Sequence, residues 1–254
     1  MVKGIDVSKF QKGLQITDVK KAGYNFVIIR GGNTGYGSQR PKRKDICFED
    51  FYRQCKAAQM PCGAYYYSCA TNKQEGIEEA TFFYENCLKG KRFEYPVYID
   101  VENDYWQAKD KKGVTDAVVG FCETLEKLGY YVGVYASLSW YVNKLDTTRL
   151  NGFSKWVAYW SEHKPNFQYN AFDLWQNSDN GMIGKYVVDT DQAFKDFPAI
   201  IKNAGKNGFK NVAEIAKEVI LGLWGVGADR KQKLTAAGYD FEAVQRKVNE
   251  ILSK

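Results

Sequence analysis

Short apolar runs that alternate with amphipathic helical patterns restrict the fold of this chain more than any other feature. Eight runs have the length and composition of buried strands, and helical patterns separate the first five of them. The clearest helix is expected over 116–128, where apolar side chains recur every three or four residues and Gly129 follows as a cap. The strands are expected at 4–8, 26–31, 63–68, 95–102, 131–137, 156–160, 173–176 and 186–191, and the other helices near 17–22, 49–59 and 74–88.

This alternation predicts parallel strands joined by right-handed crossovers. After Ser137 the apolar runs lie closer together, and long amphipathic helices are hard to find. We therefore expect an α/β fold in which five β/α units are followed by about three further strands. Eight strands suit a closed β/α barrel better than an open sheet.

The composition changes after Phe197-Pro198, so residues 1–198 are expected to form the barrel. Residues 199–210 are rich in Lys, Asn and Gly, which is typical of a linker. Residues 211–254 predict a small three-helix bundle whose first and third helices begin at the capping residues Asn211 and Asp240. The expected inward faces are Val212, Ile215, Ala216, Val219 and Leu223 in the first helix, and Phe241, Val244, Val248, Ile251 and Leu252 in the third.

Two carboxylates end the strand expected over 95–102. Asp100 and Glu102 are two residues apart, so in a strand they point to the same face with their Cα atoms about 6.7 Å apart. Active sites of β/α barrels are built at the C-terminal ends of the strands, and neighbouring carboxylates raise the pKa of one another. The alternative is a pair of solvated acids at the mouth of a loop.

Further acids end the first and last expected strands. These are Asp6 in the first strand, and Asp189 with Asp191 in the last. Closing the barrel makes these two strands neighbours, so their acids are expected to join Asp100 and Glu102. A carboxyl cluster without metal ligands suits glycoside hydrolysis, in which one acid must be protonated and others must stay ionised.

Other kinds of chemistry have little support. The only histidine, His163, lies in a loop-like segment, and no glycine-rich phosphate loop is present. The six cysteines form no C-x-x-C pair, so we expect free thiols, several of them buried, with no metal and no cofactor. The alternative of a disulfide framework is less favoured in a chain of this length.

Charge and hydropathy predict no partner beyond a polymer substrate. The net charge is +6, but acidic and basic residues are interspersed, so we expect no nucleic-acid binding. No apolar stretch is long enough to span a bilayer, and Met1 leads without an apolar segment into Gly4-Ile5-Asp6. We expect a chain made in the cytoplasm without a signal peptide and with no membrane insertion; no oligomeric state is predicted.

Aromatic side chains gather near the same strand ends. Any one of them is more often a core residue than a sugar contact, but as a group beside an acid cluster they fit a carbohydrate cleft. These residues are Tyr65, Tyr66, Tyr67, Tyr98, Tyr135, Trp160 and Trp175.

Seven short segments, in a fixed order, resemble the Chalaropsis-type lysozymes of glycoside hydrolase family twenty-five over about residues 1–198. The segments are Gly4–Ser8 with Gln11, Phe26–Arg30, Gly63–Tyr67, Tyr98–Glu102, Tyr135–Ser137, Trp175-Gln176 and Val188-Asp189. The resemblance implies a flattened barrel. It also implies hydrolysis of the β-1,4 bond between N-acetylmuramic acid and N-acetylglucosamine in bacterial peptidoglycan.

The resemblance assigns roles by position. Glu102 matches the proton donor, Asp100 the carboxylate beside it, and Asp6 and Asp189 the other acids of the site. Tyr66 stands where many members have histidine, and the family varies at Asp191. The expected substrate contacts are Tyr66, Tyr67, Tyr135, Trp175 and Asp191.

The C-terminal helices are similar to one cell-wall-binding repeat of the CW-seven type, which binds muropeptide at the C-terminus of some phage lysozymes. The resemblance implies wall contacts at Trp224 and Arg230, and Val226 stands where the family often has asparagine. For Trp224 the alternative is a core residue that closes a small bundle. The matching segments are Asn211–Ile220, Gly222–Gly225, Asp229-Arg230, Leu234, Ala237–Tyr239, Val244-Gln245 and Val248-Asn249.

These observations together predict a phage endolysin, an N-acetylmuramidase that reaches the wall after phage-mediated release. Two rival interpretations stay open. One is another glycosidase, such as a chitinase, on a similar barrel. The other is a wall-binding protein whose barrel no longer cuts.

Overall fold

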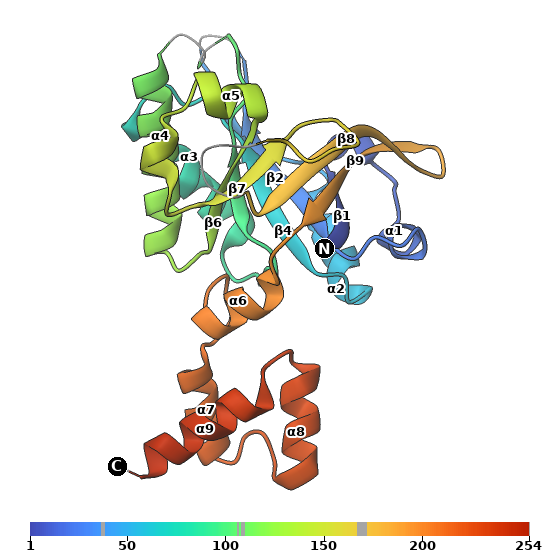
Figure 1. Cartoon of the computed structure of the whole chain (residues 1–254), viewed down its shortest axis with the longest axis vertical. Helices are drawn as coiled ribbons and strands as arrows, with labels where there is room; N and C mark the ends of the chain where they lie inside the picture. The colour runs from blue at the N-terminus through green and yellow to red at the C-terminus, as the bar shows by residue number, and fades with distance from the viewer. Residues whose placement is uncertain (37–38, 106, 108–109, 167–171, 254) are drawn as a thin grey trace.

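A closed barrel of eight strands forms the body of the molecule (Figure 1). The computed structural model describes residues 1–254 except 37–38, 106, 108–109, 167–171 and 254. Over these residues the strands are β1 (Val2–Val7), β2 (Val27–Thr34), β3 (Lys42–Lys44), β4 (Cys62–Tyr67), β5 (Val97–Asp100), β6 (Val132–Ser137), β7 (Ser154–Ala158), β8 (Leu174–Ile183) and β9 (Tyr186–Ala193).

The strand order confirms the expected barrel. Along the sheet it is β1-β9-β8-β7-β6-β5-β4-β2-β3, and β1 also pairs with β2, which closes the ring. Neighbours from β1 through β2 and β4 to β8 are parallel, whereas β9 is antiparallel to both β8 and β1. The short strand β3 pairs only with β2, outside the ring, and was not expected from the sequence.

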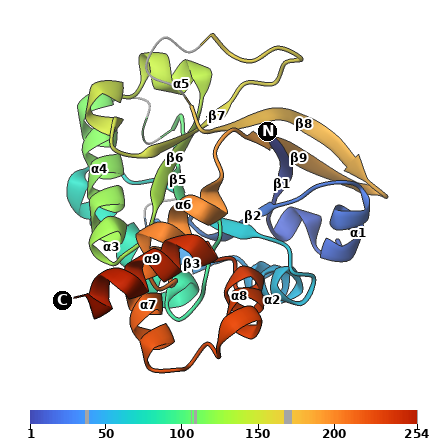
Figure 2. The same ribbon diagram turned by 60° about the horizontal axis from the view of Figure 1, so that its bottom comes forward.

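Helices cover the outside of the barrel (Figures 1 and 2). The helices α3 and α4 pack very closely, because Gly76 lies against the backbone of Ala117, where a Cβ atom would come within 2.1 Å of the carbonyl oxygen. Between β6 and β7 the described residues form only two short helical pieces, α5 and a 3-10 turn over Thr147–Leu150, as the missing amphipathic patterns indicated. The helices around the barrel are α1 (Ile16–Lys21), α2 (Phe48–Ala57), α3 (Lys73–Phe83), α4 (Lys111–Lys127), α5 (Leu138–Asn143) and α6 (Phe197–Ala204).

Alternation along the strands divides the core into two layers. Side chains such as Ile99 and Val134 point outward and pack with the helices. The alternate positions, among them Tyr98 and Trp156, fill the interior of the barrel. This interior is packed at its base, and the cavity lined by its upper residues opens at the C-terminal ends of the parallel strands.

The stretch 199–210 differs from the expected flexible linker. The helix α6 buries Phe197 and Ile201 in the interior cluster, and Asp196 caps its first turn. After it, the fully buried Asn207 donates from Nδ2 to the carbonyl oxygens of Phe93 (3.1 Å) and Tyr95 (2.9 Å). The stretch 199–210 therefore has the composition of a linker but closes the base of the barrel.

Three further helices follow at that base: α7 (Val212–Ile220), α8 (Gly227–Ala236) and α9 (Phe241–Leu252). The expected capping box of Asn211 and the cap of Asp240 are both formed. The predicted inward positions of Leu223 and Leu252 are wrong, since these side chains are 68% and 67% exposed. Leu223 lies beyond the end of α7, where the helical spacing no longer sets its direction.

Buried thiols are spread through the core. All six cysteines are free and buried, as expected for most of them. Among the described residues, no helix has the length and apolar character needed to cross a membrane.

Candidate active site

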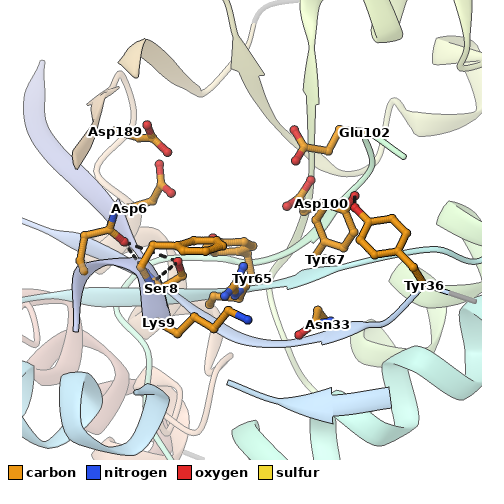
Figure 3. Close-up of a pocket in the computed structure, with 13 residues that line it drawn as sticks. Asp6, Ser8, Lys9, Asn33, Tyr36, Tyr65, Tyr67, Asp100, Glu102 and Asp189 are labelled. Atoms are coloured by element: carbon orange, nitrogen blue, oxygen red, sulfur yellow. Dashed lines mark hydrogen bonds between the residues drawn. The ribbon is translucent and has the colours of Figure 1, made fainter. Parts of the chain in front are cut away.

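A cavity of about 340 Å³ opens at the C-terminal ends of the parallel strands (Figure 3). The four acids expected at the site, Asp6, Asp100, Glu102 and Asp189, all line it. Although they lie together, no group of three or more His, Cys, Asp and Glu side chains in the described part of the chain is arranged to hold a metal ion.

Barrel closure brings these acids together from opposite ends of the sequence. Asp6 in β1 and Asp189 in β9 are direct register partners. Asp100 ends β5 and Glu102 follows two residues later, across the cavity from that pair (Figure 3). The site therefore has two facing pairs of carboxyl groups with space between them.

The environment favours protonation of part of this cluster. Burial and then the Asp189 charge raise the pKa of Asp6, and burial and then the Glu102 charge raise that of Asp100. Burial, helped by Asp179, raises the pKa of Asp189 to about 6. Glu102 is the most exposed of the four acids, yet the cavity walls, Asp189 and Asp104 still raise its pKa. The cavity therefore favours the protonated form of these carboxyl groups more than water would.

Arg30 supplies positive charge beside the acids. Its Nε donates to Asp45 at 2.7 Å, while its buried Nη2 has no hydrogen-bond partner among the described residues. The guanidinium lines the cavity and opposes the rise in the pKa of Asp6 and Asp100. It therefore helps to keep part of the cluster ionised.

A buried carboxylate secures the loop that carries Glu102. Glu79 of α3 accepts from Thr34 Oγ1 (2.6 Å) and Ser68 Oγ (2.5 Å), which end β2 and follow β4. Ser68 Oγ in turn accepts from Gln107 Nε2 (3.3 Å), and Gln107 Oε1 accepts from the backbone N–H of Asn103 (3.3 Å). The residue after Glu102 is thus tied through three side chains to the outer helix.

Two of the predicted substrate contacts lie at the cavity. Tyr67 lines it, and its hydroxyl bonds to that of Tyr36 at 2.8 Å. Tyr135 lines the narrow floor beneath the acids. Both side chains point into the barrel, so Tyr67 and Tyr135 remain proposed substrate contacts.

The other three predicted contacts are placed elsewhere. Tyr66 points outward, where its hydroxyl meets Thr34 Oγ1 (3.0 Å) and its ring packs on Phe83. Trp175 is buried and donates from Nε1 to the Tyr159 carbonyl at 2.7 Å. Asp191 points inward but lies below the cavity, where it accepts from Trp156 Nε1 at 2.8 Å. Strand parity explains the first two, since Tyr66 and Trp175 alternate with Tyr67 and Gln176.

Comparison with known proteins now adds to this geometry. The sequence pattern of "Glycosyl hydrolases family 25" matches residues 5–186, which is well over half of the chain. The chain belongs to glycosyl hydrolase family 25. A second pattern, the CW_7 repeat, matches residues 213–252. Both family resemblances of the sequence are confirmed.

Relatives of this family 25 chain include phage proteins. A "Lysozyme" from Streptococcus phage Cp-7 is 30% identical over 215 residues, which are 79% of this chain and 60% of that protein. The CTP1L endolysin superposes with a TM-score of 0.69 at 22% identity, over 80% of this chain and 70% of that one. The catalytic domain of endolysin ply40, from bacteriophage P40 of Listeria monocytogenes, superposes with a TM-score of 0.64 at 24% identity. The match covers 79% of this chain and 97% of that one.

Several cavity residues of this family 25 chain were not predicted as functional. Arg30 lines the cavity, as does Phe10, which is 75% exposed. Tyr65, which was expected only as one of the group of aromatic side chains near the strand ends, lines it too. Gln176 donates from Nε2 to Asp6 Oδ2 at 2.8 Å. For Tyr65 and Gln176 the period-two pattern was available, because each lies an even number of residues from another inward-facing side chain.

In the CW_7 repeat, the two expected wall contacts make internal bonds. Trp224 donates from Nε1 to Glu218 (2.9 Å) and packs edge-on against Tyr239. Arg230 donates from Nε to the carbonyl of Gly225 (3.0 Å). Trp224 also lines a surface hollow with Leu223 and Lys233, so a contact face is open beside its structural role.

Proposed function

We propose that this chain is a muramidase that hydrolyses the β-1,4 bond between N-acetylmuramic acid and N-acetylglucosamine in bacterial peptidoglycan. The observation that carries the proposal is the cluster of four carboxyl groups, with raised pKa, in one cavity of a family 25 barrel. Its acting place is the bacterial wall, in the manner of a phage endolysin.

Glu102 is the general acid of the proposed reaction. It is the most exposed of the four acids, and its raised pKa keeps a proton available for the leaving glycosidic oxygen. Asp100, two residues earlier, orients it and sets the local charge. The facing pair, Asp6 and Asp189, holds the water or stabilises the oxocarbenium-like transition state when ionised.

The two parts of the chain have separate roles in this proposal. Residues 1–210 form the catalytic unit, because α6 and Asn207 complete the base of the barrel. Residues 211–254 form the wall-binding repeat, with Trp224 and Arg230 as contact residues. Peptidoglycan is the partner of both parts.

Replacing Glu102 by glutamine tests the proposal. Glu102→Gln keeps the shape of the side chain but removes the transferable proton, so lysis of purified walls is expected to fall about 10²- to 10⁴-fold. The control is Glu126→Gln, the same change at an exposed position on α4. A folded Glu102→Gln protein that cleared walls at the rate of the unaltered chain would contradict the assignment.

A further inference from the structure

The Gln176 side-chain amide links the surface of the molecule to a site acid. Its Oε1 accepts two hydrogen bonds, from Trp160 Nε1 (3.1 Å) and from the Tyr135 hydroxyl (3.0 Å). Two donors at the oxygen fix which end of the amide faces Asp6. Nε2 therefore points at Asp6 and donates to Oδ2 at 2.8 Å.

Trp160 occupies an unusual position for a large aromatic side chain. Its indole N–H points inward to Gln176, yet the residue as a whole is 58% exposed. The backbone around it is held against β8, because the Tyr159 N–H donates to the Gln176 carbonyl (3.1 Å) and the Ser161 N–H to that of Asn177 (3.2 Å). Trp175 Nε1 holds the same segment through the carbonyl of Tyr159. The ring is thus fixed in place but open to solvent.

We propose that Trp160 is a sugar-stacking residue at the rim of the site and that Gln176 couples its occupancy to the orientation of Asp6. An exposed aromatic face is the surface on which the apolar face of a pyranose ring packs, and the ligand is an N-acetylhexosamine unit of the glycan. Gln176 is the positioning residue of this pair. The proposal rests on the muramidase function only for the identity of the sugar.

The hydrogen bond has a defined electrostatic effect. Donation from Gln176 stabilises the ionised form of Asp6 and lowers its pKa, against the raising effects of burial and Asp189. A sugar that packs on Trp160 and excludes water strengthens the Trp160–Gln176 hydrogen bond. It thereby also strengthens the hydrogen bond from Gln176 to Asp6. Other charged or titratable groups that act on Asp6 or respond to its charge are Arg30, Tyr65, Asp100, Glu102, Tyr135, Asp189 and Asp191.

Two substitutions at Trp160 separate the roles of ring and N–H. Trp160→Phe keeps an aromatic face but removes the donor, so on a soluble glycan oligosaccharide we expect kcat about three- to tenfold lower with little change in KM. The acid limb of the rate profile is expected about half a pH unit higher, because Asp6 then protonates more readily. Trp160→Ala is expected to raise KM about tenfold in addition. Tyr159→Phe, on the adjacent exposed side chain, is the control.

A readout without turnover makes the test independent of the reaction. NMR titration of the Asp6 carboxyl carbon is expected to give a higher pKa in Trp160→Phe, and the indole N–H signal of Trp160 is expected to shift when the oligosaccharide is added. An unchanged Asp6 pKa would overturn the coupling, and an unshifted indole with unchanged KM in Trp160→Ala would overturn the stacking. If the Asp6 pKa is higher in Trp160→Phe and the indole signal of the unaltered chain shifts with oligosaccharide, but the unaltered chain cuts no glycan, the muramidase proposal would be contradicted instead.

Discussion

At the scale of single residues, the charges at the rim set the pH range of the reaction. In the proposed reaction Glu102 is protonated and Asp189 is ionised, and each has an acidic neighbour that raises its pKa: Asp104 for Glu102 and Asp179 for Asp189. In this proposal the proton on Glu102 sets the alkaline limb of a bell-shaped rate profile, and the ionised forms of Asp189 and Asp6 together set the acid limb.

Removing either neighbouring charge is expected to move one limb only. Asp179→Asn lowers the pKa of Asp189, so the ionised form persists to lower pH and the acid limb shifts down. Asp104→Asn lowers the pKa of Glu102, so its proton is lost earlier and the alkaline limb shifts down. Both shifts are expected to be about a few tenths of a pH unit and to vanish in 1 M salt, where the screening length is about 3 Å. Rate profiles at low and high salt measure them, and a shift of the opposite sign would contradict these roles.

Sequence reasoning at this scale identified the acids but not all their partners. Asp6 and Asp100 lie at the C-terminal ends of the parallel strands β1 and β5, which barrel topology places at one mouth, and Glu102 follows β5. Asp189 lies in the first half of the antiparallel strand β9 and reaches the same mouth as the register partner of Asp6. Tyr66 was expected as a substrate contact from its position in the family resemblance, whereas its side chain lies in the outer layer of the barrel against Thr34 and Phe83. Trp160 and Gln176 meet 16 residues apart through side-chain geometry that no local pattern specifies.

At the scale of elements, the segment after α6 closes the base of the barrel. Asn207 bonds through its side chain to Phe93, Tyr95 and Tyr131, and its backbone has a φ of +54°, which asparagine tolerates better than most residues. The eight expected strands were recognisable from their apolar runs. This closure was not, because it depends on one polar side chain in a segment with the composition of a linker.

Asn207→Ala is expected to destabilise the barrel strongly. The change leaves two buried carbonyls and one partly buried N–H without their partner, which costs about 3 kcal/mol or more in the free energy of unfolding. Asn203→Ala, an exposed position on α6, is the matched control and is expected to change stability by less than about 0.5 kcal/mol. Chemical denaturation measures both, and equal stabilities would mean that the base does not depend on Asn207.

At the scale of the whole molecule, the repeat and the catalytic mouth lie at opposite ends of the barrel. The acids stand at the C-terminal ends of the parallel strands, whereas α7–α9 follow α6 at the base (Figures 1 and 2). Few polar contacts among the described residues attach the repeat. Two of them are the hydrogen bonds from Lys202 Nζ to the Ala237 carbonyl oxygen (3.3 Å) and from the Tyr239 hydroxyl to the Lys210 carbonyl oxygen (3.1 Å). In the proposed function, a wall strand held by the repeat is therefore a different stretch of polymer from the one in the cavity.

Truncation after residue 210 is expected to separate the two roles. The shortened chain keeps Asn207 and should cleave short soluble glycan at the original rate. Its lysis of intact walls should fall at least about tenfold, since the repeat no longer raises the local substrate concentration. Truncation after residue 205 removes Asn207 and is expected to lose both activities through unfolding, which circular dichroism detects. Unchanged wall lysis by the 1–210 chain would mean that one repeat contributes little to targeting.

The central claim concerns which bond is cut, and the new reducing end of the product tests it directly. Purified peptidoglycan is digested, the ends are reduced with borohydride, and the reduced sugar is identified by mass spectrometry. A muramidase leaves the new end on N-acetylmuramic acid, so muramitol is the expected product. Label on glucosaminitol would show a glucosaminidase, and no new reducing end would show a barrel that binds the wall without cutting it.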